Sequence, residues 1–426
     1  MRILLVSTYG FDPNFPSRPE YLQARALAAR GHAVVAHEYL SPRHPGQSVR
    51  HAWLEGGVAV HRSRTLGFFA PEALLRLLLV ERPDIVHIHH LRNLLGFQTA
   101  AAARRLGLPV VLTPHGLLHD GDLVADRERP LEAPLRFERL ITSLPQLART
   151  IARGAHPRRA ARNYLLHAPL RLIDGAAALS HHERDLLVRL GLPPERVTVL
   201  PNAVDLSGFP APEANRSDAE DAEGAISEMQ ASSLTPQAPT VLFIGQLVAR
   251  KGYDVLARAV PLVTRELPEV RFVLVSHNPQ DERELRRLLA EGGAGGAVSL
   301  LGRVSEAEKI RLLREATIVA APSRYEGFGI PIIEAMAAGR PIVTTDVPAG
   351  NEIVRHGENG LLFPYADHAA LARALILLLR DPQQAARLGA AGQREVYERY
   401  SAARLAADLE QWYTSVVARS TAQAHV

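Results

Sequence analysis

Short apolar runs alternate with amphipathic segments along most of the chain, and this pattern predicts strands alternating with helices. In the first half the predicted strands are Ile3–Ser7, His32–Leu40, Asp84–His90, Pro109–Pro114, Gly175–Ser180 and Arg196–Leu200. The predicted helices run from the Ser17-x-x-Glu20 start signal to Gly31, over Pro71–Glu81 and over Asn93–Leu106. Such an alternation is typical of a doubly wound parallel sheet.

A second alternating series begins at Thr240 and predicts a second sheet of the same kind. Its predicted strands are Thr240–Gly245, Arg271–Ser276, Ala297–Leu301, Ala316–Pro322 and Pro341–Thr344, and the segment Gly360–Phe363 closes the series. Its predicted helices are Val255–Leu267, Asp281–Ala290, Glu306–Glu315, one that begins at Ile330 or Pro331, Glu352–Arg355, Ala369–Arg380 and Ala402–Val417.

Two segments interrupt the alternation: an arginine-rich, mostly helical insertion and an acidic stretch, Ala211–Pro239, without aromatic residues. The acidic stretch is too polar to fold alone, so we expect a flexible linker. The expected fold class is α/β, with two Rossmann-like doubly wound domains facing across a cleft. We place an N-terminal domain at 1–205 with the insertion at about 117–172, the linker at 206–239, a C-terminal domain at 240–400, and a helix and tail at 401–426 that pack back on the N-terminal domain.

Composition is that of a soluble globular protein, with 47% hydrophobic and 22% charged residues. The absence of cysteine excludes disulfides, thiolate metal sites and cysteine nucleophiles. The chain opens on a predicted strand and no apolar run reaches ~18 residues, so we expect a cytoplasmic protein, with attachment to the inner face of a membrane left open. The run Arg153–Arg162 either attracts an anionic lipid headgroup or an acidic acceptor, or forms a solvated face, the commoner role of a charge run.

Two glutamates flank a glycine turn in the stretch Pro322–Ala338. Glu326 lies in the turn and Glu334 falls one turn into the predicted helix, whose free N–H groups favour an anionic ligand. Eight residues of continuous helix separate two carboxylates by ~12 Å, which suits an elongated, hydroxylated anion better than one metal ion. The alternative is a purely structural role, because strand, glycine turn and helix units are common in α/β folds.

The loop GQLVARKG at Gly245–Gly252 strengthens the functional interpretation. It places Arg250 beside Lys251 at the start of a helix, where a diphosphate would gain from both cations and from backbone N–H groups. Lys251 and Lys309 are the only lysines among 49 lysine and arginine residues. A lysine at this place is therefore expected to act as a compact positive charge. A solvated basic loop is the alternative.

Polar residues in the first half also fall after predicted strands, where open α/β sheets bind ligands. They are Tyr9–Arg18, His87–His90, Thr113–Gly116 and Ser180–Glu183. We interpret histidines 87, 89 and 90 as polar cleft lining and not as a metal site, because no third ligand lies nearby in sequence. Glu183 and the two histidines before it are interpreted as a helix start. Low net charge and few aromatic residues argue against nucleic acid.

Taken together, these residues resemble glycosyltransferase family 4. Glu326-x7-Glu334 with its glycine turn matches the paired-glutamate motif of that family, and Thr113–Gly116, Pro201–Asp205 and Gly339–Val354 look like further landmarks. The resemblance implies the GT-B fold and transfer of a sugar from a nucleotide-sugar donor, with retention of configuration and without a cofactor or metal. It also implies work in cell-envelope polysaccharide biosynthesis, on a glycan, lipid-linked or small-molecule acceptor.

The resemblance implies a role for each candidate residue. Lys251 and Arg250 would bind the diphosphate, Glu334 the ribose and Glu326 the transferred sugar, with His115 near the reacting carbon. The donor site would be completed by Gly245, Gln246, Gly327, Phe328, Gly329 and Ile330, and the acceptor site by Tyr9, Arg18, His89 and His90. Two departures from the family pattern are Gln246, where arginine is usual, and the bulky first loop Gly10–Glu20 in place of a glycine pair.

Front-face attack is the expected mechanism: the acceptor hydroxyl approaches from the side on which the diphosphate leaves, and Lys251 and Arg250 stabilise the growing charge. One alternative is a glycoside hydrolase that uses Glu326 and Glu334 as acid and base, although such pairs lie ~5–9.5 Å apart. The other is a catalytically silent sugar-nucleotide-binding protein, which Gln246 makes plausible.

Overall fold

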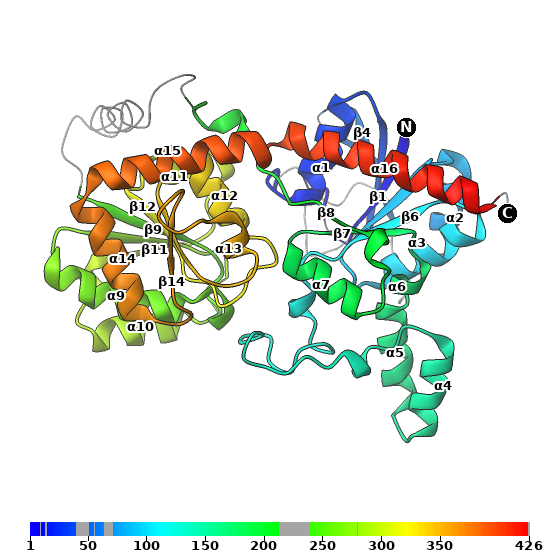
Figure 1. Cartoon of the computed structure of the whole chain (residues 1–426), viewed down its shortest axis with the longest axis horizontal. Helices are drawn as coiled ribbons and strands as arrows, with labels where there is room; N and C mark the ends of the chain where they lie inside the picture. Colours follow the sequence, from blue (N-terminus) through cyan, green and yellow to red (C-terminus); the bar gives the residue numbers. More distant parts are fainter. Residues whose placement is uncertain are drawn as a thin grey trace. The chain divides into compact units, whose positions relative to one another are not determined.

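The computed structural model describes residues 1–8, 10–12, 15–39, 51–54, 56–63, 71–212, 238–278 and 280–424. They divide into two compact units, each built on its own sheet (Figure 1). Unit 1 contains Met1–Ala125, Pro134–Ala203 and Ala402–Val426, and unit 2 contains Asp126–Ala133 and Val204–Ser401. Each sheet is covered by helices, as the alternating pattern of the sequence predicted.

The sheet of unit 1 has the order β3-β4-β2-β1-β5-β6-β7-β8. Its strands are β1 (Arg2–Val6), β2 (Ala33–Tyr39), β3 (His51–Leu54), β4 (Val58–Ser63), β5 (Ile85–His89), β6 (Val110–Thr113), β7 (Gly175–Ala178) and β8 (Val197–Val199). All described pairs are parallel except β3 with β4. Strands β3 and β4 were not predicted. The chain order reverses at β1, which lies between β2 and β5, so a ligand crevice is expected at the carboxyl ends of β1 and β5.

The helices of unit 1 are α1 (Pro19–Ala29), α2 (Pro71–Glu81), α3 (Leu94–Arg105), α4 (Leu144–Ala152), α5 (Pro157–His167), α6 (Pro169–Leu172), α7 (His181–Arg189) and α16 (Ala402–Ala424). The C-terminal helix α16 packs with α1 over the sheet, and Leu409 and Leu27 share one buried core with Leu5 of β1. The start signal at Ser17 places the beginning of α1 one residue too early. Helix α1 begins after Arg18, which makes no capping bond, and Glu20 bonds to His90 instead.

The sheet of unit 2 is parallel, with the order β11-β10-β9-β12-β13-β14. Its strands are β9 (Thr240–Ile244), β10 (Arg271–Val275), β11 (Val298–Leu301), β12 (Ile318–Ala321), β13 (Ile342–Thr345) and β14 (Leu361–Phe363). Its helices are α9 (Tyr253–Glu266), α10 (Glu282–Glu291), α11 (Glu306–Glu315), α12 (Ile330–Ala337), α13 (Gly350–Ile353), α14 (His368–Arg380) and α15 (Pro382–Arg399). Helix α15 was not predicted.

Two predicted domain boundaries differ from the observed units. Residues 204–212 belong to unit 2, where the Tyr397 hydroxyl donates to the carbonyl oxygens of Phe209 (3.2 Å) and Pro210 (2.9 Å), so the predicted linker starts too early. Residues 213–237 of that linker lie outside the described residues. The loop Asp126–Ala133, predicted within the first domain, belongs to unit 2. Among the described helices, none has the length and apolar character needed to cross a membrane.

Candidate functional site

In unit 2 the two predicted donor motifs meet at one point of the sheet. Strands β9 and β12 pair in parallel, so the loops that follow them, Gly245–Gly252 and Pro322–Gly329, lie side by side. The order of strands along the chain reverses here, which is where doubly wound sheets bind ligands. Tertiary structure therefore brings together two motifs that are about 75 residues apart in sequence.

An ion pair joins the two loops. The Lys251 ammonium donates to both carboxylate oxygens of Glu326, at 2.7 and 2.9 Å, and the Ser323 hydroxyl donates to the same carboxylate at 2.6 Å. Burial alone would raise the pKa of Glu326, but Lys251 and the Ser323 hydroxyl hold that pKa below its usual value. Glu326 is therefore ionised at neutral pH although only 7% of it is exposed.

The second glutamate of the motif has the second lysine as its partner. Lys309 of α11 donates from Nζ to Oε1 of Glu334 at 2.6 Å and also pairs with Glu306 at 2.8 Å. Burial raises the pKa of Glu334, and Lys309 only partly offsets that effect. The role of Lys309 was missed, because nothing in the local sequence indicates that its side chain reaches Glu334.

Backbone geometry at this point depends on glycine and on a buried arginine. Gly252 has a φ of 68°, and a β-carbon there would lie 1.8 Å from the carbonyl oxygen of Pro322. Arg324 pairs with Asp254 through two bonds of 2.6 and 2.7 Å and also donates to the carbonyl oxygen of Ala249. Its backbone N–H donates to the carbonyl oxygen of Arg250, which ties the two loops together. The sequence did not reveal this role of Arg324.

The remaining predicted donor residues lie on the same two loops. Gly329 has a φ of 112° and precedes α12, which begins at Ile330 as predicted. Phe328 is buried and contacts the Tyr400 ring, with 5.8 Å between centroids, while Gly245 and Gly327 complete the turns. Gln246, which stands where the family has arginine, bonds to His277 at 3.2 Å at the surface.

Unit 1 has its own pocket at the carboxyl ends of β1, β5 and β6, with a volume of about 440 Å³. Its lining residues are Thr8, Arg18, His90, Leu91, Arg92, Asn93, Pro114, His115, Gly116, Leu117, His119 and Asp120. Three predicted site residues, Arg18, His90 and His115, thus border one cavity. Tyr9 lies outside the described residues.

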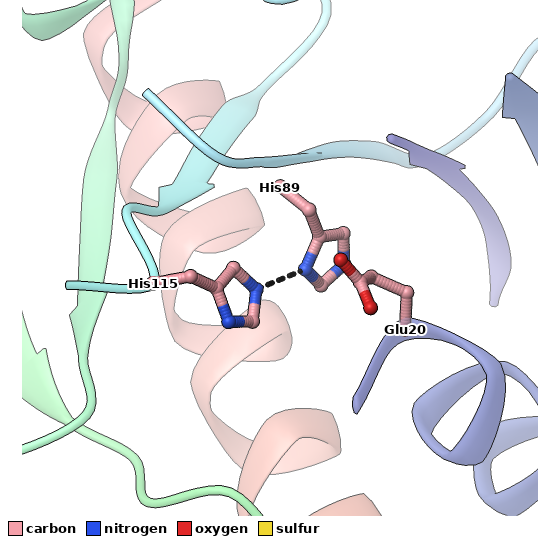
Figure 2. Close-up of side chains that lie close together, drawn as sticks. All are labelled: Glu20, His89 and His115. Atoms are coloured by element: carbon pink, nitrogen blue, oxygen red, sulfur yellow. Dashed lines mark hydrogen bonds between the residues drawn. The ribbon is translucent and has the colours of Figure 1, made fainter. Parts of the chain in front are cut away.

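His89 is buried behind the pocket and does not line it, contrary to the prediction. Its Nδ1 forms a 2.9 Å hydrogen bond with Nε2 of His115 (Figure 2), and its ring stacks on His87 with 4.3 Å between the centroids. His87 is also buried, bonded to Thr113 and to the Tyr413 hydroxyl of α16, so it belongs to the core and not to a cleft lining. Side chains of β5 alternate between faces, and the face of His87 and His89 is covered.

Glu20, His89 and His115 offer three atoms within 4.8 Å of one another, enough to hold a metal ion (Figure 2). Burial lowers the pKa of both histidines well below the usual value, so both rings are neutral and able to ligate. Asp120, Asp122 and His167 form a second such set. Glu20 and His115 are distant from His89 in sequence and come from other elements, so only the tertiary structure brings this set together.

Glu183 was missed as a functional candidate, and it holds the loop that carries His115. One carboxylate oxygen accepts from the backbone N–H groups of Gly116 (2.7 Å) and Leu117 (3.1 Å), and the other accepts from Leu179 (2.8 Å). His115 has a φ of 59°, a strained value for a residue with a side chain, so the adjacent bonds help to keep it there. Burial raises the pKa of Glu183 to about 7, against the effect of these three bonds.

Two family models match the chain, one on each unit. The model described as Glycosyltransferase Family 4 matches residues 21–207, and the model described as Glycosyl transferases group 1 matches residues 238–381. The chain belongs to glycosyltransferase family 4. The motifs at Thr113–Gly116 and Glu326–Glu334 lie inside these matches, as the sequence resemblance required.

Relatives of this family 4 chain include glycosyltransferases whose names contain an inositol compound. A phosphatidyl-myo-inositol mannosyltransferase of Mycobacterium leprae is 39% identical over 179 residues, 42% of this chain and 46% of the relative. The chain thus spans about half the length of the mannosyltransferases it matches. A D-inositol 3-phosphate glycosyltransferase of Thermobispora bispora is 27% identical over 394 residues, 88% of this chain and 82% of the relative.

Solved structures share the fold of this family 4 chain. Sucrose-phosphate synthase of Thermosynechococcus elongatus has a TM-score of 0.69 at 20% identity and covers 98% of this chain and 100% of its own. The Anabaena protein HepE, in complex with UDP and glucose, has a TM-score of 0.68 at 18% identity and covers 97% and 100%. The fold is therefore GT-B, with two Rossmann-like domains.

Proposed function

We propose that this family 4 chain is a retaining glycosyltransferase that moves a sugar from a nucleotide-diphosphate sugar to an acceptor hydroxyl. The observation that carries the proposal is the pairing of Lys251 with Glu326 where the strand order of unit 2 reverses. A cation and a carboxylate side by side at this point suit a donor that is anionic at its diphosphate and hydroxylated at its sugar.

In this assignment the donor lies along the paired-glutamate motif. Lys251 and Arg250 bind the diphosphate together with N–H groups of the loop, and Glu326 accepts hydrogen bonds from the transferred sugar. Glu334, held by Lys309, accepts from the ribose hydroxyls. The HepE structures in complex with UDP and with UDP-glucose support a uridine nucleotide as the first donor to test.

The reaction proceeds by front-face attack. The acceptor oxygen bonds to the anomeric carbon as the bond from that carbon to the diphosphate breaks, and the leaving phosphate oxygen takes the hydroxyl proton. Lys251 and Arg250 stabilise the negative charge that grows on the diphosphate, and His115 contacts the sugar near the reacting carbon. These cations supply the stabilisation that a metal ion would otherwise give, so no metal is needed.

The acceptor is assigned to the pocket of unit 1. Arg18, His90 and His115 border it and offer donors to hydroxyl or phosphate oxygens. The inositol-containing acceptors named for the relatives support a polyhydroxylated acceptor, free or lipid-linked, in cell-envelope polysaccharide synthesis. We place the protein in the cytoplasm, in peripheral contact with the inner face of the membrane.

The two alternative functions fit less well. A hydrolase would need one glutamate as acid and one as base across a single bond, whereas Glu326 and Glu334 each have a separate lysine partner. The other alternative is a catalytically silent nucleotide-binding protein. Gln246 favours this alternative, because this position usually carries an arginine that would contribute a positive charge.

The test is release of free nucleotide diphosphate from UDP-, GDP-, ADP- and dTDP-sugars in the presence and absence of inositol-type acceptors. We expect acceptor-dependent release with one donor, and Lys251→Ala to lower kcat by about 10²–10³ while the fold persists. Donor binding seen by thermal shift without any turnover would support the silent protein. Full turnover by the Lys251→Ala variant would overturn the assignment of Lys251.

A further inference from the structure

The α4–α5 hairpin of unit 1 carries arginines in a stretch without acidic residues. Between Glu138 and Asp174 the sequence contains no aspartate and no glutamate. The arginines of the hairpin are Arg149, Arg153, Arg158, Arg159 and Arg162. Within the described part of the chain, none of the five forms an ion pair with a carboxylate. On helices of unit 2, by contrast, Arg287 and Arg311 each pair with glutamates about one turn away.

Several of these side chains converge at the start of α5. His156, Arg158, Arg159 and Arg162 line a hollow of about 440 Å³. The first turn of α5 contains no acidic residue, and the side chain of His156 makes no capping bond. Positive charge is therefore concentrated on this part of the hairpin without internal neutralisation, which makes it attractive to anions.

Helix α4, in the same hairpin, presents an apolar stripe. Leu144, Leu147, Ala148 and Ile151 follow the i, i+3, i+4, i+7 spacing of one helix face, yet no residue of α4 is buried. Leu144 is 63% exposed and Ile151 is 36% exposed. In Figure 1 the hairpin extends away from the sheet of unit 1, so the described chain leaves much of this stripe uncovered.

We propose that the α4–α5 hairpin docks unit 1 on an anionic lipid bilayer. The stripe of α4 enters the interface, and the arginines contact headgroup phosphates while their stems stay in apolar surroundings. This combination favours a bilayer over nucleic acid or an acidic protein, because a bilayer offers an apolar phase for Leu144 and Ile151 beneath a layer of anions. The proposal names the surface for the membrane contact of the proposed function and requires no turnover.

Vesicle binding by the full chain tests the proposal. Co-sedimentation is measured with phosphatidylcholine vesicles and with phosphatidylcholine containing phosphatidylglycerol, at low and high salt. We expect binding only to the anionic vesicles, weakened by salt. Each cation at such a surface changes binding about fivefold, so Arg158→Gln with Arg159→Gln should weaken binding about twenty-five-fold. Leu144→Ser with Ile151→Ser should also weaken vesicle binding. Because these substitutions remove apolar contacts and no charge, the size of this loss should depend less on salt.

Matched controls come from exposed positions of unit 2. Arg283→Gln with Arg373→Gln removes the same charge, and Leu377→Ser changes a leucine that is 48% exposed. We expect both controls to bind anionic vesicles like the wild type. A circular dichroism spectrum and thermal midpoint equal to wild type would show that each variant is folded.

Three outcomes would overturn the proposal: equal binding to neutral and anionic vesicles, hairpin variants that bind like the controls, or binding to heparin or RNA in place of vesicles. Donor-dependent nucleotide release and donor thermal shift are measured in parallel on the same variants. The hairpin variants should keep both, so loss of membrane docking and failure of the proposed transferase activity are separate results.

Discussion

Lys309 donates a hydrogen bond from Nζ to Oε1 of Glu334 over 2.6 Å, just as Lys251 does to Glu326 over 2.7 Å. The two lysines of the chain therefore each neutralise one glutamate of the paired motif. Both carboxylates are more than nine-tenths buried, and a buried carboxylate without a cation is costly. Lys309 thus offsets part of the burial that raises the pKa of Glu334.

Replacing Lys309 should destabilise unit 2. In Lys309→Met the carboxylate of Glu334 stays buried without its cation, and we expect the free energy of unfolding to fall by on the order of 3 kcal/mol in urea denaturation. Adding Glu334→Gln removes the stranded charge and should restore part of the loss. Equal stability of the single and double variants would contradict the account.

Glu183 should position His115. Glu183→Ala leaves three buried N–H groups without their acceptor and loosens the strained loop, so we expect kcat to fall about 10–100-fold with donor binding unchanged. Ser180→Ala is the control, because it removes the cap of α7 without touching that loop and should cost about 1 kcal/mol of stability only. A loss of donor affinity in Glu183→Ala, or a kcat equal to wild type, would argue against a positioning role.

Glu183 should also impose a pH dependence on stability. Burial raises its pKa to about 7 in the folded protein, above the ~4.3 expected when unfolded. Between these values the folded state binds more protons, so this group's contribution is full below pH ~4.3 and is lost as pH rises towards 7. Glu183→Gln should remove this contribution, on the order of 3 kcal/mol. Urea titrations at pH 5 and pH 8 should show a smaller difference in the free energy of unfolding for the variant than for the wild type. An equal difference in both proteins would contradict this role of Glu183.

Gly252 should be irreplaceable. A β-carbon in Gly252→Ala would overlap the carbonyl oxygen of Pro322 at 1.8 Å, in a backbone conformation that also disfavours alanine, so we expect a loss of about 3 kcal/mol or more. Gly296→Ala is the matched control, since nothing lies within 4 Å of a β-carbon there. The thermal midpoints of the two variants compare them directly. Similar midpoints would show that the loops at Gly252 and Pro322 can move apart without a large loss of stability.

Local patterns predicted most strands and the start of α12 correctly, because apolar periodicity, glycine and proline act within a few residues. The motif from Glu326 to Glu334 and the loop around Lys251 were also found this way. Helix α15 and the pair β3 and β4 were missed. The start signal at Ser17 lay one residue too early, and the Glu20 carboxylate bonds to His90, 70 residues away.

The sequence by itself determined the two-sheet architecture, the family and the position of the donor motifs, since each is written in short-range residue patterns. Only the tertiary structure decided which charges meet. It paired Lys309 with Glu334, set Glu183 under the His115 loop, and buried His89 behind the pocket that it was expected to line. These contacts join residues 25 or more positions apart, so they follow from how helices pack on the sheets and from the need to neutralise buried charge.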